Sequence, residues 1–378
     1  QIFYYASICA MFGYASVFLL SKNFSNSEIG MILALGNTLA VVAQPLIAVV
    51  ADKSTSSKMN LMLRLMIGIQ IVLSLLIYFV PLPNIVLIIA MTFILAICMT
   101  LMPFMNSLAF VYDRHGYKIN FGLARGLGSV AYAVASIILG NLVAMVNASV
   151  IPMSYIIINV ALYIGVQSYS IKGLNEATVN LEEKHQEKIE GSNFFAQHKL
   201  FMIFLIGVVA IYFTHMFINN FFIQIVNNVG GNSGHMGNAI FLAAMVELPI
   251  MAYYRKINSK FSNGFLIKFS LFFFVVKHFL TYIATNMFVI YIAQASQVLA
   301  YAIFIPASVY YVNEVMDVKD QNKGQSLITT SMAMAGIFAS LAGGVLLDLI
   351  GVKETLLVGV IISAIGFVIG MFTVKDVK

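Results

Sequence analysis

The sequence predicts an all-α membrane protein with twelve transmembrane helices arranged in two pseudo-symmetric halves of six. Of its 378 residues, 61% are hydrophobic and 10% are charged, far from the roughly 45–50% and 25% typical of soluble domains. The apolar residues form long runs that contain Gly and Pro, instead of the alternating segments of about ten residues that build a β-barrel. Both observations favour a bundle of membrane-spanning helices.

Polar segments separate twelve apolar runs, each near the length of about 20 residues that a helix needs to cross the hydrocarbon. The runs lie near residues 2–20, 28–50, 60–80, 84–112, 120–145, 149–171, 199–227, 236–254, 264–285, 287–314, 324–350 and 355–373. Most connections are short, so neighbouring helices should be antiparallel. The first run lacks a small-residue cleavage site, which indicates a first span rather than a signal peptide.

The longest polar stretch, at 172–198, predicts a cytoplasmic linker between an N-terminal half at 1–171 and a C-terminal half at 199–378. The halves resemble each other, because AQPLIAVVADKSTSSK (43–58) and ELPIMAYYRKINSKFS (247–262) both place a Pro before an apolar turn and a basic loop. Two six-helix halves related by a repeat are typical of secondary transporters, whose substrate site lies near the midplane.

The net charge of +6 indicates orientation rather than a nucleic-acid partner. Most Lys and Arg of the connections fall on one side of the predicted membrane, whereas the opposite side has only Lys22 and Lys353. By the positive-inside rule, the basic side is cytoplasmic, together with both termini. We therefore predict a multi-pass monomer of a bacterial cytoplasmic (inner) membrane, with membrane lipids around it.

Glu247 is the only carboxylate in the middle of a predicted span. An ionisable group in hydrocarbon costs about 2.5 kcal/mol or more unless it faces a polar interior, so such a residue indicates a functional site. Glu247 could bind a substrate hydroxyl, pair with a cation or exchange a proton; the alternative is a structural ion pair. Lys277, deep in the run at 264–285, is a candidate partner, although it could instead face water or lipid headgroups.

Arg125, Ser129 and Tyr132 occupy positions i, i+4 and i+7 of one predicted helix and therefore form one stripe. The rigid donor fork of Arg and the ring of Tyr suit a polyhydroxylated ring, which can be hydrogen-bonded and stacked. The alternative is that Arg125, only a few residues into its span, extends toward the cytoplasmic headgroups.

Other polar side chains inside the predicted spans could line a polar cavity: Tyr14, Asn106, Ser107, His215, Asn219, Asn220, Gln294, Ser296, Gln297 and Tyr301. Amides and hydroxyls in spans often only join one helix to another, at about 1 kcal/mol or less each, so a structural role stays open for each of them. No phosphate-binding loop, Cys/His metal spacing or ATP-hydrolysing module occurs in the sequence. The sequence therefore predicts no enzyme, cofactor or metal, and any energy coupling has to come from an ion gradient.

These segments resemble the major facilitator superfamily, in the branch that includes lactose permease and the nucleoside/proton symporters. Gln44, Pro45, Leu46, Asp52 and Lys53 are similar to the gating loop between spans 2 and 3, although the usual second Gly of that loop is missing. The segment NFGLARGLGSVAY (120–132) is similar to span 5 of that branch. The resemblance implies that Arg125 binds substrate and Tyr132 stacks on it. It also implies that Glu247 is the substrate-binding carboxylate of span 8 and that Lys277 belongs to a proton relay.

The chain also departs from the permease pattern. Leu299 and Ser296 replace the acid and the histidine of span 10, Asn106 or Ser107 lies near the position of the span-4 acid, and His215 and Ile218 replace the acids of span 7. The resemblance therefore does not imply a galactoside as substrate, and a nucleoside fits almost as well as a sugar.

The sequence thus predicts proton-coupled import of a small polyhydroxylated solute, such as a sugar or oligosaccharide, by rocker-switch alternating access. The candidate residues are Arg125, Ser129, Tyr132, Glu247, Asn219, Asn106, Tyr14 and Gln294 for substrate binding, and Glu247, Lys277 and His215 for proton coupling. The alternatives are a nucleoside/proton symporter, an uncoupled uniporter, an exporter of drugs or metabolites and, more remotely, a non-transporting receptor.

Overall fold

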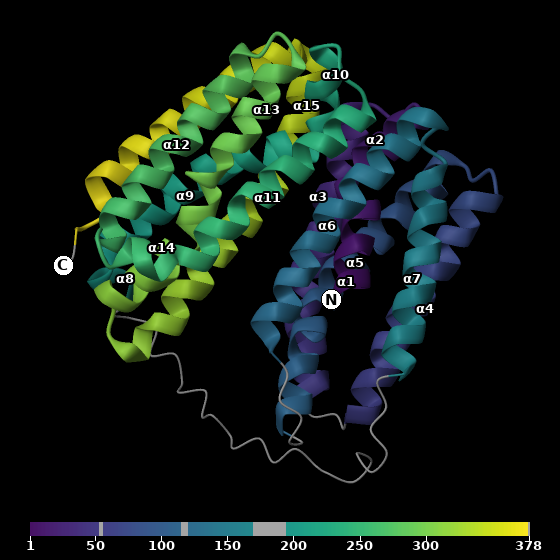
Figure 1. Cartoon of the computed structure of the whole chain (residues 1–378), viewed down its shortest axis with the longest axis horizontal. Helices are drawn as coiled ribbons and strands as arrows, with labels where there is room; N and C mark the ends of the chain where they lie inside the picture. Colours follow the sequence, from purple (N-terminus) through teal and green to yellow (C-terminus); the bar gives the residue numbers. More distant parts are fainter. Residues whose placement is uncertain (53–55, 115–119, 169–193, 377–378) are drawn as a thin grey trace. The chain divides into compact units, whose positions relative to one another are not determined.

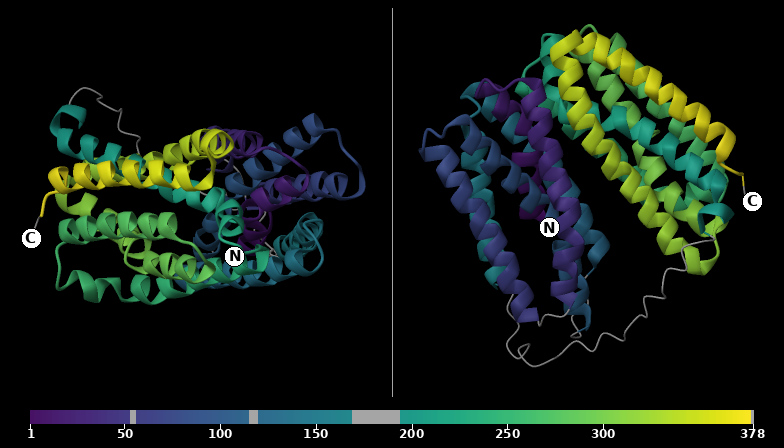
Figure 2. Two further views of the ribbon diagram at one scale, coloured as in Figure 1. Left: turned by 90° about the horizontal axis from the view of Figure 1, so that it is seen from above. Right: turned by 180° about the vertical axis from the view of Figure 1, so that it is seen from behind.

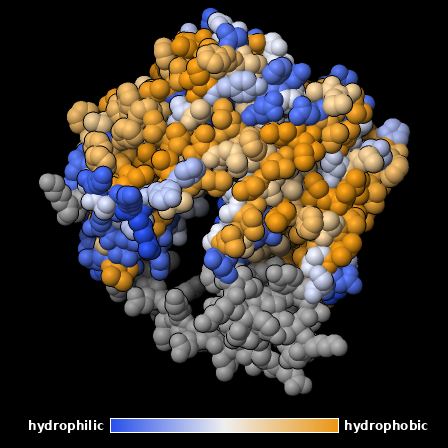
Figure 3. Space-filling view, in the orientation of Figure 1, coloured by the Kyte–Doolittle hydropathy of each residue, from blue (hydrophilic) through white to orange (hydrophobic). Residues whose placement is uncertain are grey.

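The computed structural model describes residues 1–52, 56–114, 120–168 and 194–376. Within these ranges the regular structure is helical throughout, with no strand, which confirms the predicted fold class (Figure 1). Large apolar side chains remain exposed along the helices, and apolar residues cover much of the surface visible in Figure 3. Such a surface is expected where the solvent is lipid rather than water.

The chain divides into two compact units. The first contains Gln1–Lys22 and Ile32–Ile189, and the second contains Asn23–Met31 and Glu190–Lys378. Residues 23–31 thus join the second unit, although the sequence analysis assigned them to the N-terminal half. Most of the predicted linker at 172–198 lies outside the described residues.

The first unit is built from helices joined by short connections. They are α1 (Ile2–Ile8), the π-helix η1 (Cys9–Gly13), α2 (Ala15–Ser21), most of α3 (Asn26–Asp52), α4 (Ser56–Phe79), α5 (Asn84–Arg114), α6 (Phe121–Met145) and α7 (Val150–Ser168). Within the described part of this unit, α4 packs along α7 and α1 packs along α6. The α1–α6 pairing brings the polar stripe of α6 against the aromatic residues of α1.

The second unit begins with the short helix α8 (Phe194–Gln197). It continues with α9 (Lys199–Asn220), α10 (Phe222–Asn228), α11 (Ser233–Asn258), α12 (Asn263–Ile283), α13 (Met287–Ala295), the 3-10 helix η2 (Ser296–Val298), α14 (Tyr301–Val315) and α15 (Val318–Thr373). The long helix α15 packs along both α9 and α12 (Figure 2). The core of the second unit is rich in Phe and Tyr, because the apolar runs that form it contain many Phe residues.

Ten helices of the described residues are long and apolar enough to cross a membrane, or eleven if α1 with η1 and α2, bent by 41°, form one span. The predicted runs at 324–350 and 355–373 both lie in α15, whose 56 residues would extend about 84 Å if straight. At Gly351, φ is 82° and ψ is 178°, so the chain turns there (Figure 2). The count of twelve spans stays a prediction, with the last two runs joined in α15.

Three of the runs predicted as continuous are interrupted. The first passes from α1 into the π-helix η1 and breaks at Tyr14, and the seventh breaks at Phe221. The tenth passes through η2 and Ala300 before α14 begins. Apolar composition predicts the length of a span but carries no signal for such breaks. Interruptions of this kind often mark functional positions, since they redirect side chains and expose backbone groups.

The N-terminus of α3 is held by Asp348 of α15, and both belong to the second unit. Asp348 Oδ1 accepts hydrogen bonds from the backbone and side-chain nitrogens of Asn26 at 3.1 and 2.8 Å. Its Oδ2 accepts from the backbone nitrogen and hydroxyl of Ser27 at 2.7 and 2.6 Å. A carboxylate here satisfies N–H groups that a helix start leaves unpaired and complements the helix dipole.

The same contact requires two glycines. A Cβ on Gly30 would lie 2.1 Å from the carbonyl oxygen of Ser340, and a Cβ on Gly344 would lie 2.3 Å from that of Asn26. The backbones of α3 and α15 therefore approach too closely for any side chain at these positions, as is common where membrane helices pack tightly.

We predict that Asp348→Asn lowers the thermal midpoint of the detergent-solubilised protein by several degrees. The amide keeps the shape but loses the negative charge and one acceptor oxygen, at a cost of about 1–2 kcal/mol. The control is Asp376→Asn, because Asp376 is 54% exposed in its ion pair with Lys268 and such pairs contribute little. Equal midpoints for the two variants would contradict the capping role.

Candidate functional site

Glu247 in the middle of α11 belongs to a chain of three polar side chains. The amide nitrogen Nε2 of Gln297 donates a hydrogen bond to Oε1 of Glu247. The amide oxygen of the same Gln297 accepts a hydrogen bond from Nζ of Lys277. The chain therefore runs acid, amide, base, and its members come from α11, η2 and α12.

Glu247 and Lys277, the candidate partners in the sequence, are linked through Gln297 and not by a direct ion pair. The two ion pairs found among the described residues involve neither side chain, and Gln297 lies between them. Lys277 is 0% exposed, so its ammonium depends on partners inside the protein. Gln297 accepts a hydrogen bond from the base and donates one to the acid. The amide therefore takes the place of a direct contact between the two charged groups.

The break in the tenth run brings Gln297 into this position. The hydroxyl of Ser296 donates to the carbonyl of Ala293 at 2.7 Å, a side-chain bond that competes with regular helix hydrogen bonds. Tighter 3-10 geometry follows at Ser296–Val298, and Ala300 leaves helical dihedral angles at φ −94° and ψ −87°. The sequence analysis placed Gln297 among possible cavity residues and missed its bridging position, because the break has no apolar signature.

His215 lies in a second, aromatic part of the same unit. Its ring stacks on Tyr301 with centroids 5.5 Å apart and lies 6.4 Å from the ring of His278. Its Nε2 is 3.2 Å from the amide nitrogen of Asn219, which is an exposed residue. No hydrogen bond or ion pair among the described residues joins His215 to Glu247, so its part in proton coupling stays a prediction.

His278 is a buried polar residue that the sequence analysis did not select as a site. It is 0% exposed, and its Nδ1 lies 2.7 Å from the hydroxyl of Ser363 in α15. A histidine inside an apolar run is a signal in the sequence, but its partner cannot be predicted there, because the contact joins residues 85 positions apart. This contact joins α12 to α15.

In the first unit, Arg125 of α6 lies over the ring of Tyr5 with its Cζ 4.2 Å from the ring centroid. Its Nη1 donates to the hydroxyl of Ser129 at 2.9 Å, one helical turn further into the span. The side chain therefore points away from the helix start at Asn120, unlike an arginine that extends to the headgroups. A guanidinium on an aromatic face gains about 0.5–2 kcal/mol.

Tyr5 was missed in the sequence analysis because it lies on a different predicted span from Arg125. A Cβ on Gly128 would lie 2.5 Å from the Tyr5 ring. The absence of a side chain at Gly128 thus leaves room for the Tyr5 ring against α6, where Arg125 lies over it. Gly128 is therefore a position where close packing of α1 against α6 requires a residue without a side chain.

Tyr132 and Tyr14 pack inside the first unit. The Tyr132 ring packs against the apolar core of this unit, and its hydroxyl would lie 2.9 Å from a Cβ on Gly13. Tyr14 is 0% exposed and its hydroxyl donates to the carbonyl of Ser136 at 2.6 Å. These contacts support structural roles for both rings, so substrate stacking and binding by them stay predictions.

The other residues predicted as substrate or gating residues make few described contacts that bear on transport. Asn106 lies 3.5 Å from the amide nitrogen of Gln1, and Gln294 is buried in α13. Asp52 ends α3, but its side chain and the whole of Lys53 lie outside the described residues. The amide of Gln44 donates to the carbonyl of Met99 at 3.0 Å and so joins α3 to α5.

The Arg125–Ser129 pair in the first unit and the Glu247–Gln297–Lys277 chain in the second can both bind hydroxyl groups, but neither resembles a metal centre. No group of three or more His, Cys, Asp or Glu suitable for a metal ion occurs among the residues that the structure describes. Arg125 belongs to the first unit and Glu247 to the second, and the expectation that both contact one solute stays a prediction.

Solved structures of transporters share this fold. The nucleoside transporter NupG matches with a TM-score of 0.79 over 98% of this chain and 96% of its own, at 13% identity, and a mutant of it matches with 0.83 over 99% and 98%. A bacterial homolog of the human lysosomal transporter Spinster, in an inward-facing and unoccupied conformation, matches with 0.70 over 100% and 96%, at 12% identity. At such identities the likeness shows the fold alone.

Sequence comparison extends over the same length. The uncharacterized transporter YwbF of Bacillus subtilis (strain 168) is 22% identical over 362 residues, which cover 94% of this chain and 87% of the relative. The model of the MFS_1 like family matches residues 2–358. The chain therefore belongs to the MFS_1 like family and is a transporter of the major facilitator type, as its sequence predicted.

Proposed function

We propose that this transporter carries a small polyhydroxylated solute, a sugar or a nucleoside, into the cell together with protons. The observation that carries the proposal is the hydrogen-bonded chain of Glu247, Gln297 and Lys277 inside the second unit. Ionisable groups inside membrane spans commonly mark substrate or proton pathways. Arg125 on Tyr5 adds a planar donor group on an aromatic face in the first unit.

Proton coupling follows from the chemistry of the acid in this chain. An ionised Glu247 balances the charge of Lys277 through Gln297, and a protonated Glu247 leaves that charge without its counterpart. Proton uptake by Glu247 therefore favours a different arrangement of the three side chains. A conformational equilibrium shifts toward whichever state binds the proton and solute better.

The solute class is proposed from the donors and acceptors available. Vicinal hydroxyls can donate to a carboxylate and accept from a guanidinium, and both sugars and nucleosides carry them. NupG, a nucleoside transporter of the same fold, supports testing nucleosides first. The first experiment is uptake by proteoliposomes of labelled nucleosides and of labelled mono- and oligosaccharides. Accumulation of none of them would contradict this solute class.

We predict that Glu247→Gln lowers solute accumulation driven by an imposed pH gradient at least tenfold, because the amide cannot exchange a proton. Counterflow of solute without a gradient should remain measurable. Glu354→Gln is the matched control, since Glu354 is an exposed carboxylate of α15. Unchanged uphill accumulation in Glu247→Gln vesicles would rule out the proton role, and a wild-type protein that only equilibrates solute would be a uniporter.

We predict that Tyr5→Leu raises the KM for solute about two- to thirtyfold, the factor equivalent to losing a cation–π contact. Tyr5→Phe should leave KM unchanged, because it keeps the ring and the Tyr5 hydroxyl is buried without a hydrogen-bond partner among the described residues. The measurement is initial uptake rate against solute concentration. Equal KM values for the two variants would show that the ring does not position Arg125 for binding.

We further propose that the protein lies in a bacterial cytoplasmic membrane with both termini in the cytoplasm, on the basis of its charge distribution. Lys353→Cys should then react with a membrane-impermeant maleimide in intact cells, and Lys256→Cys only after permeabilisation. Both lysines are exposed, and the native Cys9 and Cys98 are 0% exposed and should not react. The reverse labelling pattern would place both termini outside.

A further inference from the structure

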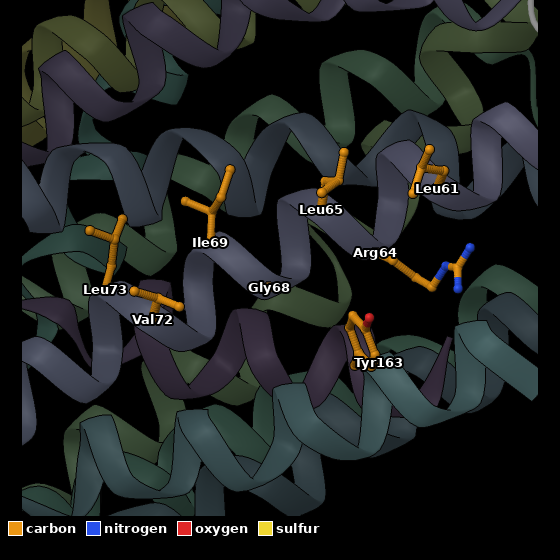
Figure 4. Close-up of a pocket in the computed structure, with 8 residues that line it drawn as sticks. All are labelled: Leu61, Arg64, Leu65, Gly68, Ile69, Val72, Leu73 and Tyr163. Carbon is orange, nitrogen blue, oxygen red and sulfur yellow. The ribbon is translucent and has the colours of Figure 1, made fainter.

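A groove of about 440 Å³ follows α4 on the first unit (Figure 4). Leu61, Leu65 and Ile69 lie four residues apart on one stripe, and Arg64, Gly68 and Val72 lie on the next. Tyr163 of α7 lines the groove near Arg64 (Figure 4). This set is called the α4 groove below, and it takes no part in the transport proposal.

Most of the groove is apolar, and it is open. Leu65 and Val72 are 58% and 57% exposed, and Leu61 and Ile69 are each 49% exposed. A Cβ on Gly68 would have no atom within 4 Å, so the missing side chain of this glycine deepens the groove instead of admitting a neighbouring helix. From Leu61 to Leu73 the groove spans about 18 Å at 1.5 Å per residue, close to the roughly 15 Å of one leaflet's hydrocarbon.

One end of the groove is polar and positively charged. Arg64 and Tyr163 lie at this end, whereas Val72 and Leu73 lie at the other (Figure 4). The Nε of Arg64 makes one long hydrogen bond, 3.4 Å to the carbonyl of Asn60. Among the described residues, Arg64 has no ion pair. Its guanidinium fork can therefore bind a phosphate group, and the Tyr163 hydroxyl can donate to the same group.

We propose that the α4 groove binds an anionic glycerophospholipid, with one acyl chain along Gly68 and the phosphate at Arg64 and Tyr163. The occupant is chosen by charge and length together. An acyl chain matches the apolar length of the groove, and an anionic headgroup complements the Arg64 guanidinium, which has no ion pair within the described part of the chain. Basic sites between membrane helices are known to select anionic headgroups. The inference concerns the lipid-facing side of the first unit and stands independently of the transported solute.

The chain contains no Trp, so a single introduced Trp reports on the lipids beside it. Leu65→Trp places the reporter in the groove, and Ile206→Trp places it on α9 of the second unit at a comparable distance from the helix start. Both positions are similarly exposed, at 58% and 60%. Each protein is reconstituted in vesicles of phosphatidylglycerol and phosphatidylcholine in equal amounts, with one or the other lipid brominated to quench the fluorescence.

We expect the quenching at position 65 to indicate an enrichment of phosphatidylglycerol over phosphatidylcholine of about fivefold, and no enrichment at position 206. Adding Arg64→Gln or Gly68→Leu to Leu65→Trp should bring the ratio to that of position 206. Arg255→Gln and Gly165→Leu are the matched controls, because Arg255 is exposed on α11 and a Cβ on Gly165 also meets no atom within 4 Å. Neither control should change the ratio.

Two results would overturn the proposal. The first is equal quenching by the two brominated lipids at position 65, which would mean that the groove holds bulk lipid. The second is weak quenching by both lipids relative to position 206, which would mean that protein, such as a second copy of the chain, covers the groove. Ile69→Trp provides a second reporter in the same groove if Leu65→Trp does not fold.

Discussion

The structure depends on one constraint: a polar group inside the hydrocarbon must find its partner within the protein. Lys277 is wholly buried and bonds to Gln297, which bonds in turn to Glu247. Arg125 solves the same problem with an aromatic face and a hydroxyl of its own helix. Removing one of these side chains would leave its neighbour buried without a hydrogen-bond partner. Because water cannot substitute for the missing partner, that neighbour would carry the full free-energy cost of burying a polar or charged group.

The breaks in the helices follow from the same constraint. A continuous helix presents each side chain at a fixed angle, and the acid on α11 and the base on α12 need a third group between them. The turn of 3-10 helix at Ser296–Val298 provides that group by changing the direction of Gln297. At the break, the backbone nitrogens of Leu299 and Ala300 donate to the carbonyls of Ser296 and Gln297 at 3.0 and 3.1 Å. Irregular backbone is tolerated within membranes where its polar groups are satisfied in this way.

Apolar composition was sufficient to predict the fold class and the approximate span limits, whereas the family was predicted from the resemblance of a few segments, such as residues 120–132. It also singled out Glu247, Lys277 and Arg125, because a charged residue within an apolar run is conspicuous. Tyr5 and Gln297 could not be predicted as partners, since aromatic and amide residues are common in spans and their pairing depends on how distant helices pack. The same reason explains why Glu247 and Lys277, which the sequence offered only as candidate partners, do not pair directly. Depth in a span fixes height in the membrane but not rotation about the helix axis.

The position between Glu247 and Lys277 requires a side chain that donates a hydrogen bond on one side and accepts one on the other, as Gln297 does. An amide is the uncharged side chain that offers a donor and an acceptor on one rigid fork, so its two ends are fixed by an acid on one side and a base on the other. Turning that amide over would oppose donor to donor and acceptor to acceptor in a single step. The three side chains therefore have a direction, and a rearrangement that separates Glu247 from Gln297 leaves the orientation of the amide set by Lys277 alone.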